Sequence, residues 1–156
     1  MSKISVLMSV YKKENPEYLR ASLESVLVQT RTADEILLIE DGPLTQELYQ
    51  VVAEYQKKCD YLHVHAMEQN VQLGRALAKG VELCQYDLIA RMDTDDIAMP
   101  DRLEKEGAYM EAHPEVDVVG GAIREFNDEG TIDRVKNMPK TQEEILEYVK
   151  VRNPLN

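Results

Sequence analysis

The sequence predicts an α/β fold in which a mainly parallel sheet is flanked by helices in three layers: helix, sheet and helix. Segments typical of strands and of helices alternate along residues 4–120, as βαβ crossover connections between parallel strands require. The strand segments are largely continuous apolar runs, which are typical of strands buried on both faces of a parallel sheet. Together these two observations predict helices on both faces of the sheet.

The first half of the chain opens with a buried strand, Ile4–Val10. Asn15-Pro16 then supplies an N-cap and a first-turn proline for a helix that runs to about Thr30. The apolar run Glu35–Glu40 predicts the second strand. Thr45 is placed to cap the helix that follows it, which has apolar residues at helical spacing.

The next part of the chain continues the same alternation. Leu62–Ala66 alternates between apolar and polar residues like a third strand, and Leu73–Cys84 has helical spacing. Tyr86–Met92 predicts a fourth strand, Pro100–His113 a helix, and Val116–Gly120 a fifth strand.

The alternation stops after residue 121. Ala122–Asn127 and Thr131–Lys136 predict a hairpin around the turn Asp128-Glu129-Gly130. The segment Thr141-Gln142-Glu143-Glu144 has the pattern of a capping box and predicts the start of a last helix. We find no repeats, linkers or low-complexity segments.

Composition and charge narrow the classes of function. The 156 residues suit one domain, and 44% hydrophobic with 30% charged residues is ordinary for a globular protein. The net charge of −11 argues against a nucleic-acid partner, because phosphates need a basic surface. It suits a protein that holds an anionic ligand through a metal ion and backbone N–H groups. Cys59 and Cys84 fit no metal or redox motif, so we expect both to be reduced and structural.

Polar clusters follow three of the predicted strands. They are Tyr11-Lys12-Lys13-Glu14, Asp41-Gly42 and Asp93-Thr94-Asp95-Asp96. Ligands of open α/β sheets bind beyond the carboxyl ends of the strands, where these clusters converge. We therefore predict the functional site at this edge of the sheet.

The last of these clusters carries the sharpest chemical signal. Asp93 and Asp95 are two residues apart, so in extended backbone their side chains point the same way. Two nearby carboxylates repel unless a cation lies between them, and Mg²⁺ or Mn²⁺ accepts a few carboxylates when phosphate oxygens complete its shell. The alternative is that these aspartates, with Asp96 and Asp101, are favourable charges at the N-terminus of the following helix. We favour the cation site for Asp93 and Asp95 and leave both interpretations open for Asp96 and Asp101.

Other motifs account for the aspartates less well. An EF-hand loop starting at Asp93 would need glycine where Ala98 stands and an oxygen ligand where Ile97 stands. A DxDx(T/V) phosphatase would place its nucleophilic aspartate after the first strand, whereas Asp93 follows the fourth. The sequence also lacks the G-x-G-x-x-G and P-loop patterns. His63 and His65 share a strand face, but no third metal ligand accompanies them, so we expect a structural pair.

Four motifs together give the chain a specific resemblance. They are Ser5-Val6-Leu7-Met8-Ser9-Val10-Tyr11, Ile39-Glu40-Asp41-Gly42, Asn70-Val71-Gln72-Leu73-Gly74-Arg75-Ala76-Leu77-Ala78-Lys79-Gly80 and Ala90-Arg91-Met92-Asp93-Thr94-Asp95-Asp96. In this order and at these spacings the chain resembles family 2 glycosyltransferases, which have the Rossmann-like GT-A fold. Within that family it is most similar to bacterial enzymes of exopolysaccharide and capsule synthesis, including the amylovoran type. The resemblance runs from about Lys3 to Asn156.

The resemblance implies a role for each matching residue. The residues implied in nucleotide binding are Val10, Tyr11, Glu14, Asp41, Asn70, Leu73, Gly74, Arg91 and Asp93. Among them, Asp41 would hydrogen-bond the base, commonly uracil. Asp93 and Asp95 form the DxD motif, with Asp95 as the more direct ligand of Mg²⁺ or Mn²⁺ and Asp93 reaching the ribose or the metal. Arg91 would orient Asp93 or meet phosphate.

Several features depart from the family pattern. The second strand usually ends in Asp-Asp-Gly-Ser, but here it ends in Glu40-Asp41-Gly42-Pro43, and Gln72 stands where the family usually has glycine. The family's catalytic base and acceptor-binding elements match nothing in this chain. We therefore expect a single GT-A domain, 1–156, truncated at its C-terminus. Residues 1–121 would form the nucleotide-sugar half and residues 122–156 the start of the acceptor-side half.

The resemblance implies an inverting, metal-dependent transferase that moves a sugar from a nucleotide-diphosphate sugar, with UDP as the first choice, to a saccharide or lipid-linked acceptor. It also implies a cytoplasmic protein, with the parent enzyme at the inner face of the plasma membrane. Two other classes remain open: a catalytically incomplete nucleotide-sugar-binding fragment, and an unrelated α/β enzyme that handles phosphate.

Overall fold

A computed structural model gives the structure of the chain and describes residues 1–127 and 134–153. The chain divides into two compact units, Met1–Glu111 and Ala112–Asn156, and each unit is described by itself. All the residues predicted to bind nucleotide or metal lie in the first unit. In the described part of the chain no helix is both long enough and apolar enough to cross a bilayer.

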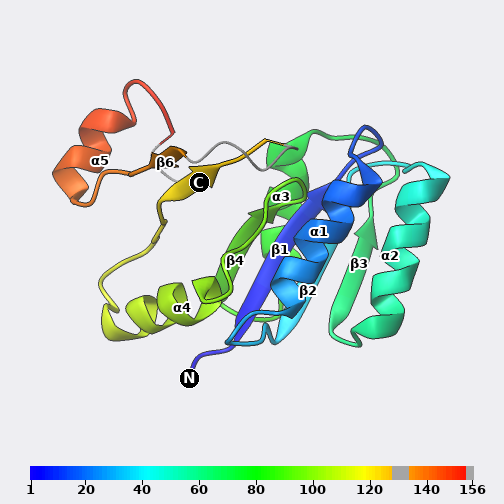
Figure 1. Cartoon of the computed structure of the whole chain (residues 1–156), viewed down its shortest axis with the longest axis horizontal. Coiled ribbons are helices and arrows are strands. Elements are labelled where there is room, and N and C mark those ends of the chain that lie inside the picture. Colours follow the sequence, from blue (N-terminus) through cyan, green and yellow to red (C-terminus); the bar gives the residue numbers. More distant parts are fainter. Residues whose placement is uncertain (128–133, 154–156) are drawn as a thin grey trace. The chain divides into compact units, whose positions relative to one another are not determined.

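Four parallel strands form the sheet of the first unit (Figure 1). In spatial order they are β3 (Leu62–Ala66), β2 (Glu35–Glu40), β1 (Ile4–Val10) and β4 (Leu88–Asp93). Every residue of the two central strands is buried except Ser9, which is partly buried. The longest apolar runs of the sequence therefore form the centre of the sheet, and the prediction of a mainly parallel sheet is confirmed.

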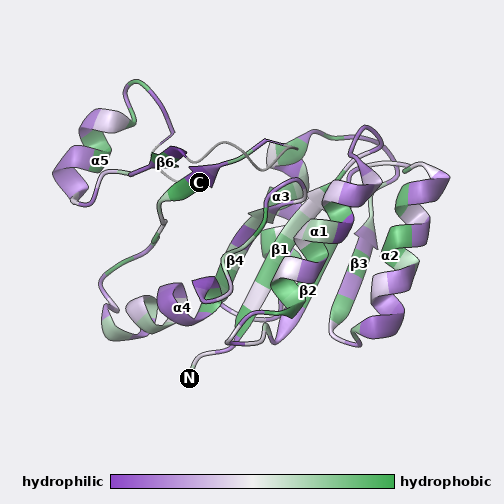
Figure 2. Cartoon of the chain, viewed as in Figure 1, coloured by the Kyte–Doolittle hydropathy of each residue, from purple (hydrophilic) through white to green (hydrophobic). Residues whose placement is uncertain are grey.

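Helices cover both faces of this sheet. They are α1 (Pro16–Leu27), α2 (Gln46–Lys58), α3 (Leu73–Leu83) and α4 (Arg102–Ala112). The even-numbered side chains of β1 pack against α1 and α2, and Leu103 of α4 joins this cluster. On the opposite face, Leu7 of β1 and Ile39 of β2 pack with Ala76 of α3. Figure 2 shows hydrophobic residues concentrated on the central strands between the helices, so the predicted three layers are confirmed.

Local capping signals placed two of the helix starts correctly. The side chain of Asn15 accepts a hydrogen bond from the N–H of Glu17 (2.9 Å), and that of Thr45 accepts one from the N–H of Leu48 (3.4 Å). The end of α1 was less well predicted, because the N–H of Thr30 donates to the carbonyl of Pro100 (2.8 Å) instead of continuing the helix.

Two predictions about strands are wrong. The segment Val116–Gly120 forms no strand, and its Val118 is 61% exposed. An apolar run alone does not make a strand, because a strand also needs a neighbouring backbone to pair with. The fourth strand begins at Leu88 rather than Tyr86, because the N–H of Tyr86 donates to the hydroxyl of Ser5 (3.2 Å).

The second unit contains a hairpin and a short helix. β5 (Ile123–Glu125) and β6 (Arg134–Lys136) are antiparallel, as the sequence predicted. The predicted turn Asp128-Glu129-Gly130 and the strand start at Thr131 lie outside the described residues. The capping box at Thr141 is confirmed at the start of α5 (Gln142–Tyr148), where Thr141 and Glu144 bond each other's backbone N–H groups.

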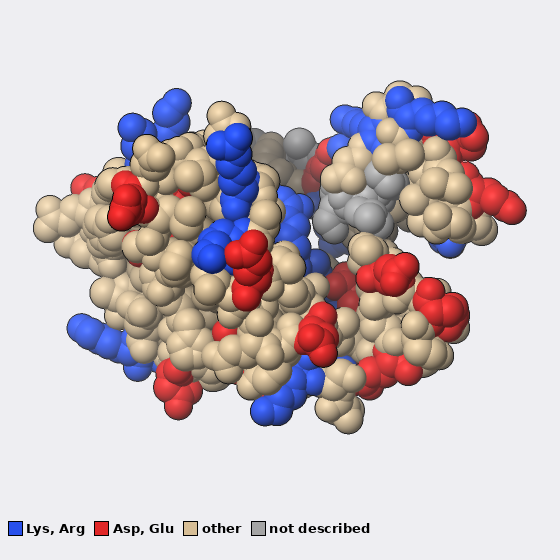
Figure 3. Space-filling model, turned by 180° about the vertical axis from the view of Figure 1, so that it is seen from behind, with Lys and Arg blue, Asp and Glu red and all other residues tan. Residues whose placement is uncertain are grey.

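Charged side chains of both signs are interspersed over the side of the molecule drawn in Figure 3. Many of them pair along the helix surface, as Lys79 does with Glu82 on α3 (3.0 Å). Such exposed pairs contribute little to stability, at about 0–1 kcal/mol each. The fold therefore depends on the two apolar clusters on either side of the sheet rather than on its surface charge.

Candidate functional site

Three neighbouring strands end together at the carboxyl edge of the sheet. In the ladder register Ser9 of β1 lies beside Asp93 of β4, and Val10 lies beside Glu40 of β2. One residue further along, the N–H of Asp41 donates to the carbonyl of Val10 (2.8 Å). The fold therefore brings together the strand ends that carry the predicted nucleotide and metal residues.

Asp41 connects the end of β2 to the loop that follows β3. Its carboxylate accepts hydrogen bonds from the side-chain amide of Asn70 (2.9 Å) and from the N–H of Val71 (2.6 Å). The amide of Asn70 also reaches the carbonyl of Asp41 (3.1 Å). A carboxylate has about four acceptor positions, so these two bonds leave capacity for a donor on a ligand. The structure thus joins two of the residues predicted to bind nucleotide.

Gly42 allows this close approach of the two loops. Its φ of +83° is a backbone conformation that residues other than glycine rarely adopt. A Cβ atom at this position would lie 2.6 Å from the backbone nitrogen of Asn70. The Asp-Gly sequence after β2 is therefore required by geometry, since a carboxylate and an empty position are both needed next to Asn70.

The loop after β1 is tied to the end of β4 by Glu14. Its carboxylate accepts hydrogen bonds from the N–H of Asn15 (2.8 Å) and from the hydroxyl of Thr94 (2.6 Å). The side chain of Val10 is fully buried in the core, whereas Tyr11 is 44% exposed. Of these predicted pocket residues, Tyr11 presents its side chain to solvent and Val10 packs in the core beneath the edge of the sheet. Glu14 bonds Thr94, the middle residue of the Asp93-Thr94-Asp95 motif.

Asp93 is the last residue of β4, and Asp95 and Asp96 follow it in the turn. Asp93 makes an ion pair with Arg91, two residues earlier on the strand; whether Arg91 orients Asp93 or meets phosphate stays a prediction. Partial burial, and then the negative charges of Asp93 and Asp95, raise the pKa of Asp96. The repulsion among these carboxylates favours the protonated form of Asp96.

The donor set fits a hard divalent cation whose shell is completed by a ligand. Within residues 1–127 and 134–153 no group of three or more His, Cys, Asp or Glu side chains is placed to hold a metal ion, so a cation here would need ligands from the nucleotide or from water. Mg²⁺ and Mn²⁺ at nucleotide sites are commonly held by one or two carboxylates together with phosphate oxygens and water. Asp93 and Asp95 supply this number and type of ligand.

The start of α3 borders the same loop. Leu73, which is 47% exposed, and Gly74 form its first turn, three and four residues beyond Asn70. A Cβ at Gly74 would meet nothing within 4 Å. Gln72, which precedes them, has φ +73° and ψ 153°, and its side chain makes no capping bond. This residue holds a strained backbone conformation where the resembling family usually has glycine.

Four buried polar residues next to the site escaped the sequence reasoning: Ser22, Ser25, Gln29 and Thr94. Thr94 was treated only as the spacer between two aspartates. Ser22, Ser25 and Gln29 recur at spacings of three and four residues within the apolar stripe of the helix after Asn15. Polar residues repeated on a buried helix face were the signal that could have identified them.

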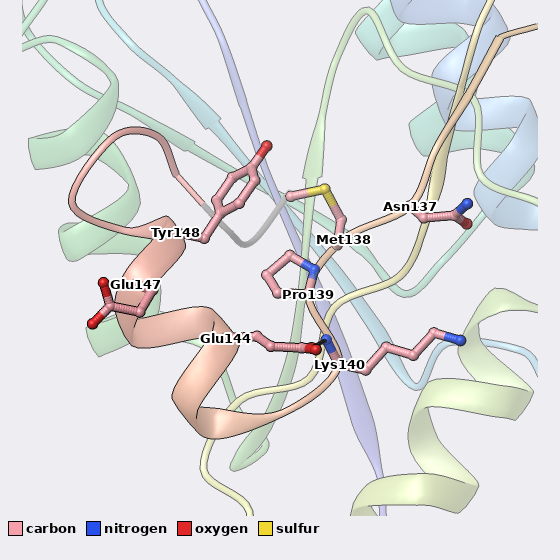
Figure 4. A pocket seen from close by; sticks show the side chains of 7 residues that line it. All are labelled: Asn137, Met138, Pro139, Lys140, Glu144, Glu147 and Tyr148. Atoms are coloured by element: carbon pink, nitrogen blue, oxygen red, sulfur yellow. Dashed lines mark hydrogen bonds between the residues drawn. The ribbon is translucent and has the colours of Figure 1, made fainter.

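The second unit has an open surface hollow of its own. It is lined by Asn137, Met138, Pro139, Lys140, Glu144, Glu147 and Tyr148 (Figure 4). Lys140 and Glu144 are adjacent there because the N–H of Lys140 donates to the Glu144 carboxylate (2.9 Å) as part of the helix cap. This bond is part of the helix cap, and none of the predicted site residues lines the hollow.

Comparison with known proteins gives consistent results. The family model described as "Glycosyl transferase family 2" matches residues 5–155. The amylovoran biosynthesis glycosyltransferase AmsE of Erwinia amylovora is 43% identical over 152 residues, which are 97% of this chain and 56% of that protein. A UDP-Gal:alpha-D-GlcNAc-diphosphoundecaprenol beta-1,3-galactosyltransferase of Escherichia coli is 34% identical over 160 residues, covering 99% of this chain and 56% of that protein. The chain thus spans just over half the length of these relatives.

Solved structures show the same fold. The S. aureus TarS 1-349 complex with UDP has a TM-score of 0.71 at 22% identity, covering 88% of this chain and 38% of that one. The mannosyltransferase PcManGT from Pyrobaculum calidifontis, in complex with GDP-Man and Mn²⁺, has a TM-score of 0.63 at 14% identity, covering 79% and 35%. At these identities the likeness establishes the GT-A fold alone. With a family model that matches nearly its whole length, the chain belongs to glycosyl transferase family 2.

Proposed function

We propose that this chain carries the donor-binding part of an inverting, metal-dependent glycosyltransferase that uses a UDP-sugar. The observation that carries the proposal is that Asp93, at the end of β4, and the Asp41–Asn70 pair, beyond the ends of β2 and β3, lie at the same edge of the sheet on either side of β1. The carboxylates of Asp93 and Asp95 suit a cation bound to diphosphate. The side chains of Asp41 and Asn70 offer a carboxylate and an amide to the nucleotide base. The UDP and GDP-Man–Mn²⁺ complexes of proteins with the same fold support this interpretation.

Each side chain then has a defined task in the donor complex. Asp41 accepts a hydrogen bond from the base, and the exposed ring of Tyr11 packs against the nucleoside. Arg91 holds Asp93 in place through their ion pair. A divalent cation bound by Asp93 and Asp95 supplies positive charge that stabilises the diphosphate leaving group. The base that deprotonates the acceptor hydroxyl is assigned to none of the described residues.

The acceptor and the location are part of the same proposal. The E. coli relative is named for a diphosphoundecaprenol-linked acceptor, and AmsE for amylovoran biosynthesis. We therefore assign the parent protein to surface-polysaccharide synthesis, with a saccharide or lipid-linked acceptor, in the cytoplasm at the inner face of the plasma membrane. Residues 1–121 would bind the donor, and residues 122–156 would begin the acceptor side.

A second candidate is a catalytically incomplete fragment that binds nucleotide sugar without transferring it. The coverage of 56% of each relative favours this possibility for the 156-residue chain alone. The two candidates are separated by measuring UDP-sugar hydrolysis and transfer with this chain and with the full-length gene product. The fragment hypothesis predicts tight donor binding with negligible transfer by the 156 residues.

The proposal is tested by thermal shift with UDP-, GDP- and dTDP-sugars, each with Mn²⁺ and with EDTA. A ligand that binds only the folded state raises its stability, so UDP-sugars with Mn²⁺ should give the largest shift. Asp95→Ala should remove the Mn²⁺-dependent part of that shift. Asp101→Ala is the matched control, because Asp101 lies in the same acidic segment but pairs with Lys105 (2.5 Å). Equal shifts for wild type and Asp95→Ala would contradict the proposal.

A further inference from the structure

Helix α1 and its C-terminal extension bury a row of polar side chains beneath the candidate site. Ser22 is 0%, Ser25 6% and Gln29 7% exposed. Their spacing of three and four residues places them on one face, beside the apolar Leu23 and Val26 that join the main core. Burying polar groups costs free energy unless each group finds a hydrogen-bond partner, so this face has a specific partner rather than a general packing role.

That partner is the backbone of the segment that follows β4. The hydroxyl of Ser22 donates to the carbonyl of Asp93 (3.0 Å), and the hydroxyl of Ser25 accepts from the N–H of Ala98 (3.0 Å). The side-chain amide of Gln29 bonds the segment twice. Its Nε2 donates to the carbonyl of Met99 (2.8 Å), and its Oε1 accepts from the N–H of Leu103 (3.0 Å).

The segment depends on these bonds because it is irregular. Between the end of β4 at Asp93 and the start of α4 at Arg102 the backbone is neither helix nor strand, so no ladder satisfies its polar groups. Buried backbone groups need partners, and the row provides them at Ala98 and Met99 within the segment and at Asp93 and Leu103 on its two flanks. The carbonyl of Asp93 and the backbone from Ala98 onward are therefore held from α1 and its extension, on either side of Asp95, while Glu14 holds Thr94 from the loop after β1.

We propose that Ser22, Ser25 and Gln29 are positioning residues, which hold the Asp93–Asp95 segment in the geometry that binds a divalent cation together with a nucleoside diphosphate. The inference rests on the proposed donor-binding function. According to this inference, α1 and its extension affect the affinity for the metal-bound nucleotide although they carry none of the ligands. Partners that orient metal ligands commonly change metal affinity by about 10–100-fold when they are removed.

The test measures UDP affinity by titration calorimetry, once with Mn²⁺ and once with EDTA. Gln29→Met keeps the length of the side chain and removes both of its bonds to the segment; Ser25→Ala removes one oxygen atom and is the milder variant. We expect Gln29→Met to lower the Mn²⁺-dependent affinity for UDP by about tenfold or more, and Ser25→Ala by a smaller factor. The affinity in EDTA should stay as in wild type, because the proposed base-binding pair, Asp41 and Asn70, follows β2 and β3 and makes no bond to this segment.

Val26→Ala on the same helix is the matched control. Val26 is 3% exposed and packs in the apolar core, so its truncation lowers the unfolding temperature without touching the segment. It should leave UDP affinity with Mn²⁺ unchanged. If Ser25→Ala and Gln29→Met lower the unfolding temperature as Val26→Ala does but bind Mn²⁺–UDP like wild type, the row is merely structural and the inference is overturned. If wild type itself shows no Mn²⁺-dependent affinity for UDP, the proposed function fails and this inference fails with it.

Discussion

Replacing Gly42 with alanine should damage both the stability of the first unit and its nucleotide site. At φ +83° an alanine is strained by about 1–2 kcal/mol. Its Cβ would also lie 2.6 Å from the backbone nitrogen of Asn70, and a backbone atom cannot rotate out of the way. Asn70 must therefore move, and moving it breaks hydrogen bonds to the Asp41 carboxylate, each worth about 1.5–3 kcal/mol.

Strain together with the loss of one such bond gives a destabilisation of about 2.5–5 kcal/mol. The free energy of unfolding is measured by urea titration at 25 °C, followed by far-UV circular dichroism. Gly74→Ala is the matched control for stability, because a Cβ there meets nothing within 4 Å and the residue is helical. It should change stability by less than about 1 kcal/mol. If Gly42→Ala costs less than about 1 kcal/mol and binds UDP like wild type, the link between Gly42 and the Asp41–Asn70 pair is refuted.

Three further predictions concern backbone strain, packing and pH. Gln72→Gly should raise the free energy of unfolding by about 1 kcal/mol, because it relieves the φ of +73° at some cost in unfolded-chain entropy; an unchanged urea midpoint would contradict the strain. Gly80→Ala should lower stability by about 1–2 kcal/mol in the same assay, because its Cβ would lie 2.3 Å from the Cδ1 of the buried Leu7. Burial, and then the neighbouring Cys59, raise the pKa of Tyr61 to about 12. The neutral phenol is thus favoured in the folded state, so its contribution is complete below about pH 10 and is lost as the pH rises towards 12. Unfolding titrations at pH 9 and 11 should show a larger loss for wild type than for Tyr61→Phe.

Local signals in the sequence predicted much of the fold. The bounds of β1 and β2 follow from apolar runs and those of β3 from the alternation of apolar and polar residues. Asn15 and Thr45 marked two helix starts, because capping acts over a few residues. The prediction of a strand at Val116–Gly120 was wrong because strand formation also depends on residues far away in the chain. The apolar residues of this segment are a local property, whereas a place in a sheet depends on a distant backbone.

The site was predicted as a set of residues but not as a set of contacts. The sequence placed Asp41, Glu14 and Asp93 at strand ends that converge at one edge of the sheet, as the structure shows. It did not show that Glu14 bonds Thr94 or that Asp41 bonds Asn70, because these partners are far apart in the chain. Their roles toward a nucleotide and a cation stay predictions until the binding experiments are done.

The position of β4 at the border of the sheet has a consequence for how the protein opens. β4 pairs with β1 on one side, and its residues are only partly buried except for Met92. Cooperative units with few buried contacts detach more easily than the centre of a domain. Amide hydrogens of β4 and the following turn should therefore exchange before those of β1 and β2, so that Asp93 leaves its place while the two central strands stay paired. A nucleotide that contacts both Asp41 and Asp93 would slow this exchange most at β4, because it binds only while β4 is in place.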